Sequence, residues 1–219
     1  MLKRYIQSFH SVFLDPQDES GSLAEINANL PKRAARRMSR MGMMLHYLLQ
    51  DLDLRLDTTI VYGTCFSESS ALEKYLDSFP HASPTAFQTS IHPGGIEQAL
   101  ILDNREVGAF MPMAGSRTLF LQMLKVALAA ASEEVVICGG EEKGGWLRDF
   151  NLAYTSSFSF AMRLGGDSST AIGELVWMDG DEPATEQIPE LEQAVRDLKD
   201  VRELEMGGPG LGRLKISLK

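Results

Sequence analysis

The chain has 219 residues, and its hydrophobic share of 44% is enough for one substantial core or two small ones. A formal net charge of −9 argues against a nucleic-acid-binding surface, because such surfaces neutralise phosphates with lysine and arginine. The sequence shows no signal peptide and no run of about 18 apolar residues, so it predicts a protein of the reducing cytoplasm.

The first half of the chain combines strand patterns with helical ones. Alternating apolar residues predict an opening strand over 5–14, and apolar residues at helical spacing predict a helix over about 34–52. A β-branched run over 58–62 predicts a short buried strand. The serines from Ser67 to Ser70 can cap a helix over 71–79.

The second half opens with Ser83-Pro84, which predicts a turn and an extended piece before a helix from about Gly95. A strand over about 107–113, a turn of small residues and an apolar helix then precede a buried strand that ends at Gly139-Gly140. The remaining chain predicts an antiparallel hairpin, a short amphipathic helix and a final strand, over 157–164 with 171–178, 190–198 and 214–218.

Strands that alternate with helices, followed by a late hairpin, are typical of an α/β fold. We therefore expect a mixed, mainly parallel sheet flanked by helices, with antiparallel strands added late. No linker rich in proline, serine or glycine divides the chain, so a single domain over residues 1–219 is predicted.

Two cysteines and four histidines give few candidates for catalysis or metal binding. Cys65 lies in the turn Gly63-Thr64-Cys65-Phe66 after a predicted strand, which imitates the strand-turn-helix of a nucleophile elbow. A small cysteine hydrolase using Cys65 is one hypothesis, and a cysteine that packs in the core as a small apolar side chain is the favoured one. The histidines lack the spacing of a metal site, so we expect neither a metal nor a cofactor.

Three segments of the chain carry a family resemblance. The first leads from Arg37-Met38-Ser39-Arg40 to VYGTCFSES, the second is SPTAFQTSIHPGGIEQALI, and the third is MAGSRTLFLQMLKVALAAASEEVVICGGEE. Together they cover about residues 34–142 and resemble the N-terminal half of β-ketoacyl synthases of the thiolase superfamily, in particular short, chain-length-factor-type proteins of aryl polyene clusters. The resemblance implies half of a thiolase-like fold.

The nucleophile of that family is missing at its expected place. In these enzymes a cysteine heads the helix of the third segment, and its position falls here on Ala114, or on Met113 if the alignment slips by one. Neither side chain can be acylated, and the hydroxyl of Ser116 is a poor nucleophile without a base nearby. The family also supplies two histidines, or a histidine and an asparagine, from a C-terminal half that this chain ends before. The resemblance therefore implies a catalytically inactive protein.

The resemblance also implies a partner. A chain length factor heterodimerises with a full-length β-ketoacyl synthase, lines the acyl tunnel and meets the acyl carrier protein through the complex, here in aryl polyene or fatty-acid-like polyketide biosynthesis. Pairing would use the strand over 107–113, with interface candidates Val107, Ala109, Phe110, Met111 and Met113.

Four side chains are candidates for the wall of the acyl tunnel: Phe66, Phe87, Met43 and Met44. Ordinary core packing explains the aromatic pair and the methionines equally well. A second hypothesis for the whole chain is a homodimer without enzymatic activity, which uses the same strand edge to bind an acyl group or an acyl carrier protein.

Overall fold

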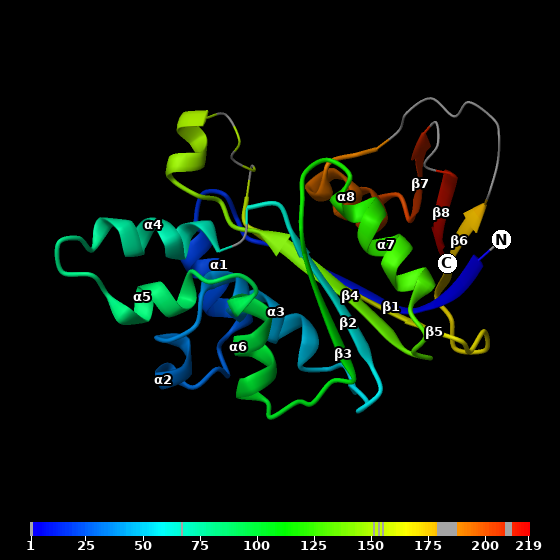
Figure 1. Cartoon of the computed structure of the whole chain (residues 1–219), viewed down its shortest axis with the longest axis horizontal. Coiled ribbons are helices and arrows are strands. Elements are labelled where there is room, and N and C mark those ends of the chain that lie inside the picture. The colour runs from blue at the N-terminus through cyan, green and yellow to red at the C-terminus, as the bar shows by residue number, and fades with distance from the viewer. Residues whose placement is uncertain are drawn as a thin grey trace.

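The computed structural model describes residues 2–66, 68–150, 152, 154, 156–178, 188–208 and 212–219. These residues form one eight-stranded sheet with the strand order β3-β2-β4-β5-β1-β6-β8-β7 (Figure 1). The strands are β1 (Leu2–Phe13), β2 (Thr59–Thr64), β3 (Ala109–Ala114), β4 (Val135–Glu141), β5 (Phe158–Gly165), β6 (Gly173–Met178), β7 (Glu203–Gly208) and β8 (Gly212–Leu218). The edges of the sheet are therefore β3 and β7.

Parallel pairing is confined to one end of the sheet. β2 pairs in parallel with β3 and β4, whereas the ladders that join β4, β5, β1, β6, β8 and β7 are antiparallel. The α/β class, the mixed sheet and the late antiparallel strands are confirmed, but the parallel share is smaller than the sequence predicted. The reason is that β5 pairs antiparallel with β4, and every ladder from β5 through β1, β6 and β8 to β7 is antiparallel as well.

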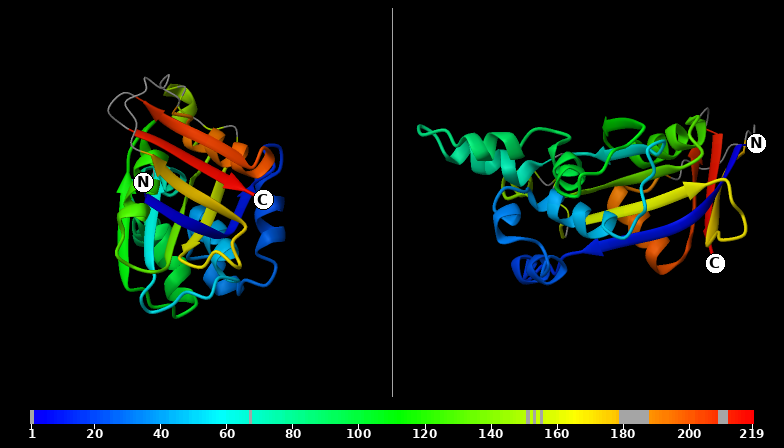
Figure 2. Two further views of the ribbon diagram at one scale, coloured as in Figure 1. Left: turned by 90° about the vertical axis from the view of Figure 1, so that its right-hand side faces the viewer. Right: turned by 90° about the horizontal axis from the view of Figure 1, so that it is seen from below.

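Helices cover both faces of the sheet. α7 (Leu119–Ala129) and α8 (Leu191–Asp200) pack on one face, and α3 (Arg40–Leu49) and α6 (Gly94–Leu102) pack on the other. Figures 1 and 2 show α4 (Ser69–Asp77) and α5 (Pro84–Thr89) as a hairpin that projects beyond the sheet, away from the two chain ends. The other helical elements are α1 (Glu19–Ile26), α2 (Lys32–Ala35) and a 3-10 turn (Trp146–Phe150). None of the helices in the described ranges is long and apolar enough to span a membrane.

Alternate side chains of the central strands enter two separate cores. On β2, Val61 packs beneath α7, whereas Ile60 and Tyr62 pack against α3 and α6. On β4, Ile137 packs in the core beneath α7, and Val136 packs in the core against α3 and α6. Every residue of these two strands is buried, which explains why both have nearly continuous apolar sequences.

Two helical segments differ from the sequence prediction. The predicted helix over 34–52 is split, because the Ser39 side chain accepts the N–H of Gly42 and begins α3 as its N-cap. The piece after Ser83 is helical rather than extended. Here the Ser83 side chain accepts the N–H of Ala86, and proline occupies the first turn, where its missing N–H is not needed. In both places a serine cap decides where a helix begins.

The predicted hairpin over 157–164 and 171–178 is wrong. The strands β5 and β6 are present, but they lie on opposite sides of β1 and do not pair with each other. One strand, β7, was not predicted from the sequence; it forms an antiparallel pair with β8 at the edge of the sheet. The hairpin error concerns which strands are neighbours, and alternation within a strand carries no information about its neighbours.

Candidate functional site

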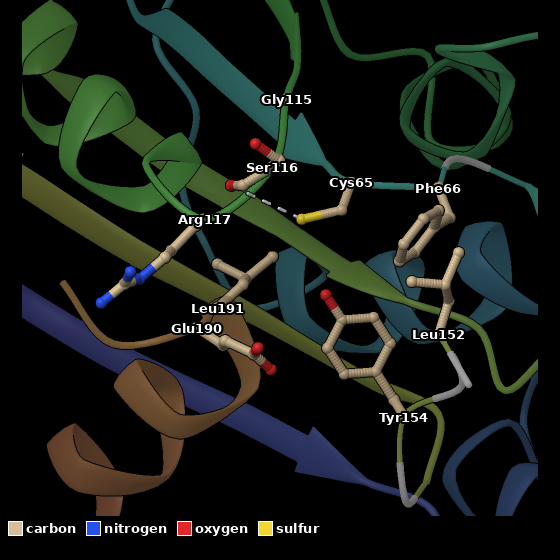
Figure 3. Close-up of a pocket in the computed structure, with 9 residues that line it drawn as sticks. All are labelled: Cys65, Phe66, Gly115, Ser116, Arg117, Leu152, Tyr154, Glu190 and Leu191. Atoms are coloured by element: carbon tan, nitrogen blue, oxygen red, sulfur yellow. Dashed lines mark hydrogen bonds between the residues drawn. The ribbon is translucent and has the colours of Figure 1, made fainter. Parts of the chain in front are cut away.

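A cavity opens where the parallel strands β2, β3 and β4 end. The carboxyl ends of parallel strands are the usual place for ligands in open α/β sheets. The cavity has a volume of about 280 Å³, and its lining is shown in Figure 3: Cys65, Phe66, Gly115, Ser116, Arg117, Leu152, Tyr154, Glu190 and Leu191. The lining comes from the turn after β2, the β3–α7 turn, the chain before β5 and the start of α8.

The β3–α7 turn follows Met113 and Ala114, the two residues on which the resemblance to β-ketoacyl synthases places the nucleophile position. Ala114 ends β3 and is exposed, whereas Met113 is partly buried against the core beneath α7. The cavity lining from this turn begins at Gly115 and continues through Ser116. The strand, the turn and the helix that begins at Leu119 are therefore present, with a methyl group at position 114.

The Cys65 thiol contacts the far side of the same turn. It donates to the backbone carbonyl of Ser116, with 3.9 Å between sulfur and oxygen, and it interacts with the Tyr154 hydroxyl. Burial, together with the charge of Glu141, raises the pKa of Cys65 to about 12. A thiol with this pKa stays protonated at neutral pH, and the thiolate is the nucleophilic form. The raised pKa of this thiol therefore disfavours a cysteine hydrolase that uses Cys65.

Phe66 and Tyr154 form an aromatic wall on another side of the cavity. Their rings meet edge to face with 6.1 Å between centroids, and the Tyr154 ring meets that of Phe158 at 5.6 Å. Burial and the charge of Glu141 raise the pKa of Tyr154, so its hydroxyl keeps its proton. The cavity thus combines apolar surface with the protonated Cys65 and Tyr154 groups and with two charged side chains, Arg117 and Glu190.

A buried carboxylate, Glu141, lies beneath the turn after β2. The chain reaches this position through Gly139-Gly140, where a Cβ on either glycine would collide with a neighbouring strand. The Glu141 carboxylate accepts the backbone N–H groups of Cys65 and Phe66 and the hydroxyl of Thr64. Burial raises the pKa of Glu141 to about 7, although these hydrogen bonds act in the opposite direction.

The next residue, Glu142, holds a different part of the fold. Its carboxylate accepts the N–H of Met41 in α3 at 2.9 Å and the N–H of Ser70 in α4 at 3.0 Å. It therefore caps two helix N-termini at once, where a negative charge is favourable. Burial raises the pKa of Glu142 as well, opposed by these N–H groups and by Arg40. Two adjacent carboxylates thus serve the cavity turn and the helices separately.

The structure brings together only part of the predicted tunnel wall. Phe66 lines the cavity. Phe87 lies on the projecting α4–α5 hairpin, is 49% exposed, and has its ring 5.3 Å from that of Tyr75. Met44 is buried in the core between α3 and the sheet, and Met43 beside it is partly buried. The predicted wall is therefore divided between the cavity, the hairpin and α3.

The predicted interface residues follow an open edge of the sheet. β3 pairs with β2 on one side, and no strand among the described residues pairs with its other side. Val107 and Phe110 pack against the α3–α6 core, Met113 packs toward α7, and Met111 is 38% exposed. Pro112 has no N–H to donate to a ladder, which an edge strand tolerates.

Sequence reasoning missed three polar side chains that line the cavity, namely Arg117, Tyr154 and Glu190, and it also missed Glu141 beneath it. For Glu141 the sequence did contain an indication. This glutamate ends a buried strand, directly after two glycines, and a glutamate that is buried there is expected to have hydrogen-bonding partners. Tyr154 lies outside the periodic segments, and Glu190 is the first residue of the predicted helix over 190–198, where a glutamate is common, so neither gave a signal of a site. Across the residues that the structure describes, no group of three or more His, Cys, Asp or Glu side chains is placed to hold a metal ion.

No protein-family model matches the chain, and no curated protein matches it. Among solved structures, the chain is similar to one in the complex of a ketosynthase (ApeO) with its chain length factor (ApeC) from Xenorhabdus doucetiae. The TM-score is 0.66 at 18% sequence identity, over 99% of this chain and 100% of that chain. The ishigamide ketosynthase/chain length factor matches with a TM-score of 0.56 at 12% identity, over 69% of this chain and 51% of that chain. The thiolase-like ketosynthase fold predicted from the sequence is thus confirmed.

Proposed function

We propose that the chain is a non-condensing partner of a full-length β-ketoacyl synthase, of the chain-length-factor type. In this role it pairs with the synthase and forms one side of the acyl tunnel, in aryl polyene or fatty-acid-like polyketide biosynthesis. The growing acyl group reaches the complex on an acyl carrier protein. The ketosynthase fold supports this proposal. So does the structural match to a chain in the complex of a ketosynthase with its chain length factor.

The observation that carries the proposal is the open strand β3, which ends at Ala114. A condensing enzyme needs a thiolate at the head of the following helix and an oxyanion site beside it. Here a methyl group takes the place of the thiolate, and the Cys65 thiol at the cavity is protonated at neutral pH. The outer edge of β3 keeps its backbone hydrogen-bonding groups available, which favours pairing with a strand of another chain.

Phe66 and Phe87 are the proposed tunnel contacts. Phe66 closes one side of the cavity. Phe87 belongs to a cluster of aromatic rings with Tyr75 and Phe79 on the α4–α5 hairpin, and both phenylalanines of this cluster are exposed. A projecting hairpin with exposed rings is suited to contact a partner subunit. Met44 lies in the core between α3 and the sheet, and Met43 lies beside it. For both methionines a tunnel contact stays a prediction.

The substitution Phe66→Ala tests the tunnel role. In a complex with a co-purifying ketosynthase, the variant should shift the products toward longer acyl chains, because the cavity loses the ring that closes it. Mass spectrometry of products formed from malonyl-loaded acyl carrier protein measures the shift. Phe150→Ala removes a ring that is 66% exposed and lies outside the cavity lining, so it is the matched control. An unchanged distribution for Phe66→Ala would remove Phe66 from the tunnel.

The open edge of β3 also fits the homodimer hypothesis, since two copies could pair through it. The mass of the purified chain separates the two functions. The proposed function predicts a particle of 24.2 kDa that associates when a ketosynthase is added, whereas a homodimer has twice that mass. Sedimentation equilibrium measures both states. A stable homodimer that persists in the presence of a ketosynthase would favour the acyl-binding or carrier-binding protein.

A further inference from the structure

The turn that carries Phe66 into the cavity wall lies just outside the β-ladder. β2 ends at Thr64, so the backbone N–H groups of the next two residues fall beyond the strand. Both donate to Glu141 instead: the N–H of Cys65 to Oε1, and the N–H of Phe66 to Oε2 at 3.1 Å. The Thr64 hydroxyl donates to Oε1 at 3.0 Å. One carboxylate therefore holds three consecutive residues.

The surroundings of Glu141 indicate that its role is to hold the backbone in place. Its side chain is fully buried, and among the described residues it forms no ion pair. Glu134, at the other end of the same strand, differs because its carboxylate pairs with Arg163 at 2.7 Å. A buried carboxylate without a cation is unfavourable unless N–H and O–H donors surround it. The donors that Glu141 gathers belong to the last residue of β2 and to the turn after it.

Phe66 is fixed from a second direction through its ring. The ring packs on Tyr154, and the Tyr154 ring packs on Phe158 in the core. Figure 3 shows Phe66 and Tyr154 along the cavity, with the Tyr154 hydroxyl directed toward Cys65. With both its backbone and its ring held, Phe66 closes the cavity in one defined position.

We propose that Glu141 is the positioning residue for Phe66 and thereby sets the width of the acyl cavity. This inference rests on the proposed function, because the width matters only if an acyl chain enters. Glu141 is not part of the cavity lining and acts through the backbone of the turn. Glu142 is the internal comparison, since it is an equally buried carboxylate that holds Met41 and Ser70 instead.

The variant Glu141→Gln keeps the side-chain shape but converts one acceptor oxygen to an NH2 group, so at least one of the two turn amides loses its acceptor. Amide hydrogen exchange followed by NMR should become about tenfold faster at Cys65 or Phe66, as expected for the loss of a hydrogen bond to a charged group. Glu142→Gln should accelerate exchange at Met41 and Ser70 and leave the turn unchanged. Unchanged exchange of both turn amides in Glu141→Gln would overturn the inference.

The wild-type chain provides a check that needs no variant. The amides of Cys65 and Phe66 should exchange slowly although they lie in a turn, because each has an acceptor on Glu141. Rapid exchange of both amides in the wild-type chain would also overturn the inference, even if Glu141→Gln failed to fold.

Product analysis in the complex distinguishes positioning from a purely structural role. Glu141→Gln should shift the products in the same direction as Phe66→Ala, and Glu142→Gln should not shift them. If Phe66→Ala shifts the products and Glu141→Gln does not, the positioning role is wrong and the proposed function stands. If neither variant shifts the products although Glu141→Gln loosens the turn, Phe66 is not part of the tunnel and the role of Glu141 in cavity width is wrong. The proposed function itself is then decided by whether the chain pairs with a ketosynthase.

Discussion

Replacing Met111 with arginine should abolish pairing with the ketosynthase while leaving the fold of the chain intact. Met111 is 38% exposed on β3, so a longer polar side chain meets solvent in the free chain. In the proposed complex the same side chain enters an apolar interface between strands, where an unpaired guanidinium loses its hydration at a cost of several kcal/mol. Since about 1.4 kcal/mol corresponds to a tenfold change, the dissociation constant should rise by about a hundredfold or more.

The matched control for Met111→Arg is Val201→Arg. Val201 is 66% exposed and lies between α8 and β7, at the opposite edge of the sheet from β3. Both variants should keep the circular dichroism spectrum and melting temperature of the wild-type chain. In isothermal titration calorimetry with a ketosynthase, only Met111→Arg should fail to pair. If Met111→Arg pairs as tightly as Val201→Arg, β3 is not the interface, and the proposed function loses its main support.

The elements that the sequence predicted well are those with a local pattern. β2 and β4 are short, fully buried runs, and α7 repeats its apolar residues at helical spacing. The strand, turn and helix around Ala114 follow one another directly, so neighbouring residues contain the whole signal. The nucleophile position itself was placed on Ala114 through the resemblance to β-ketoacyl synthases, and that assignment stays a prediction.

The features that the sequence did not predict depend on contacts between distant residues. Phe13 of β1 pairs with Phe158 of β5, and this pairing across the chain separates β5 from β6. The Glu141 carboxylate meets backbone groups that lie 75 and 76 residues earlier. Neither contact produces a periodic pattern of residues in the segments that it joins. Burial of Glu141 is also the reverse of what its charge alone suggests, since it depends on donors that only the folded chain assembles.

Glu141 should make the stability of the chain fall as the pH rises from 5.5 to 8. Burial raises its pKa to about 7 in the folded chain, above the ordinary value of 4.5. Between these values the unfolded chain has released the proton and the folded chain still holds it, so a rising pH favours unfolding. Each pKa unit corresponds to about 1.4 kcal/mol, and the interval from pH 5.5 to the folded pKa therefore removes about 2 kcal/mol. The window starts above the isoelectric point of about 5.0, where the chain would be least soluble.

The variant Glu141→Gln cannot titrate, so its free energy of unfolding minus that of the wild-type chain should rise by about 2 kcal/mol across this window. Urea unfolding at constant ionic strength measures both. Glu205→Gln is the control. Arg213 lowers the pKa of Glu205 in the folded chain, and the ordinary value of 4.5 in the unfolded chain also lies below the window, so Glu205 is ionised in both states and its difference should stay constant. Parallel profiles for Glu141→Gln and the wild-type chain would contradict the raised pKa and mean that the amides of Cys65 and Phe66 keep the group charged. Diverging profiles would instead support the raised pKa. At neutral pH, similar numbers of folded molecules would then hold this turn with the carboxylate form of Glu141 and with its carboxylic acid form.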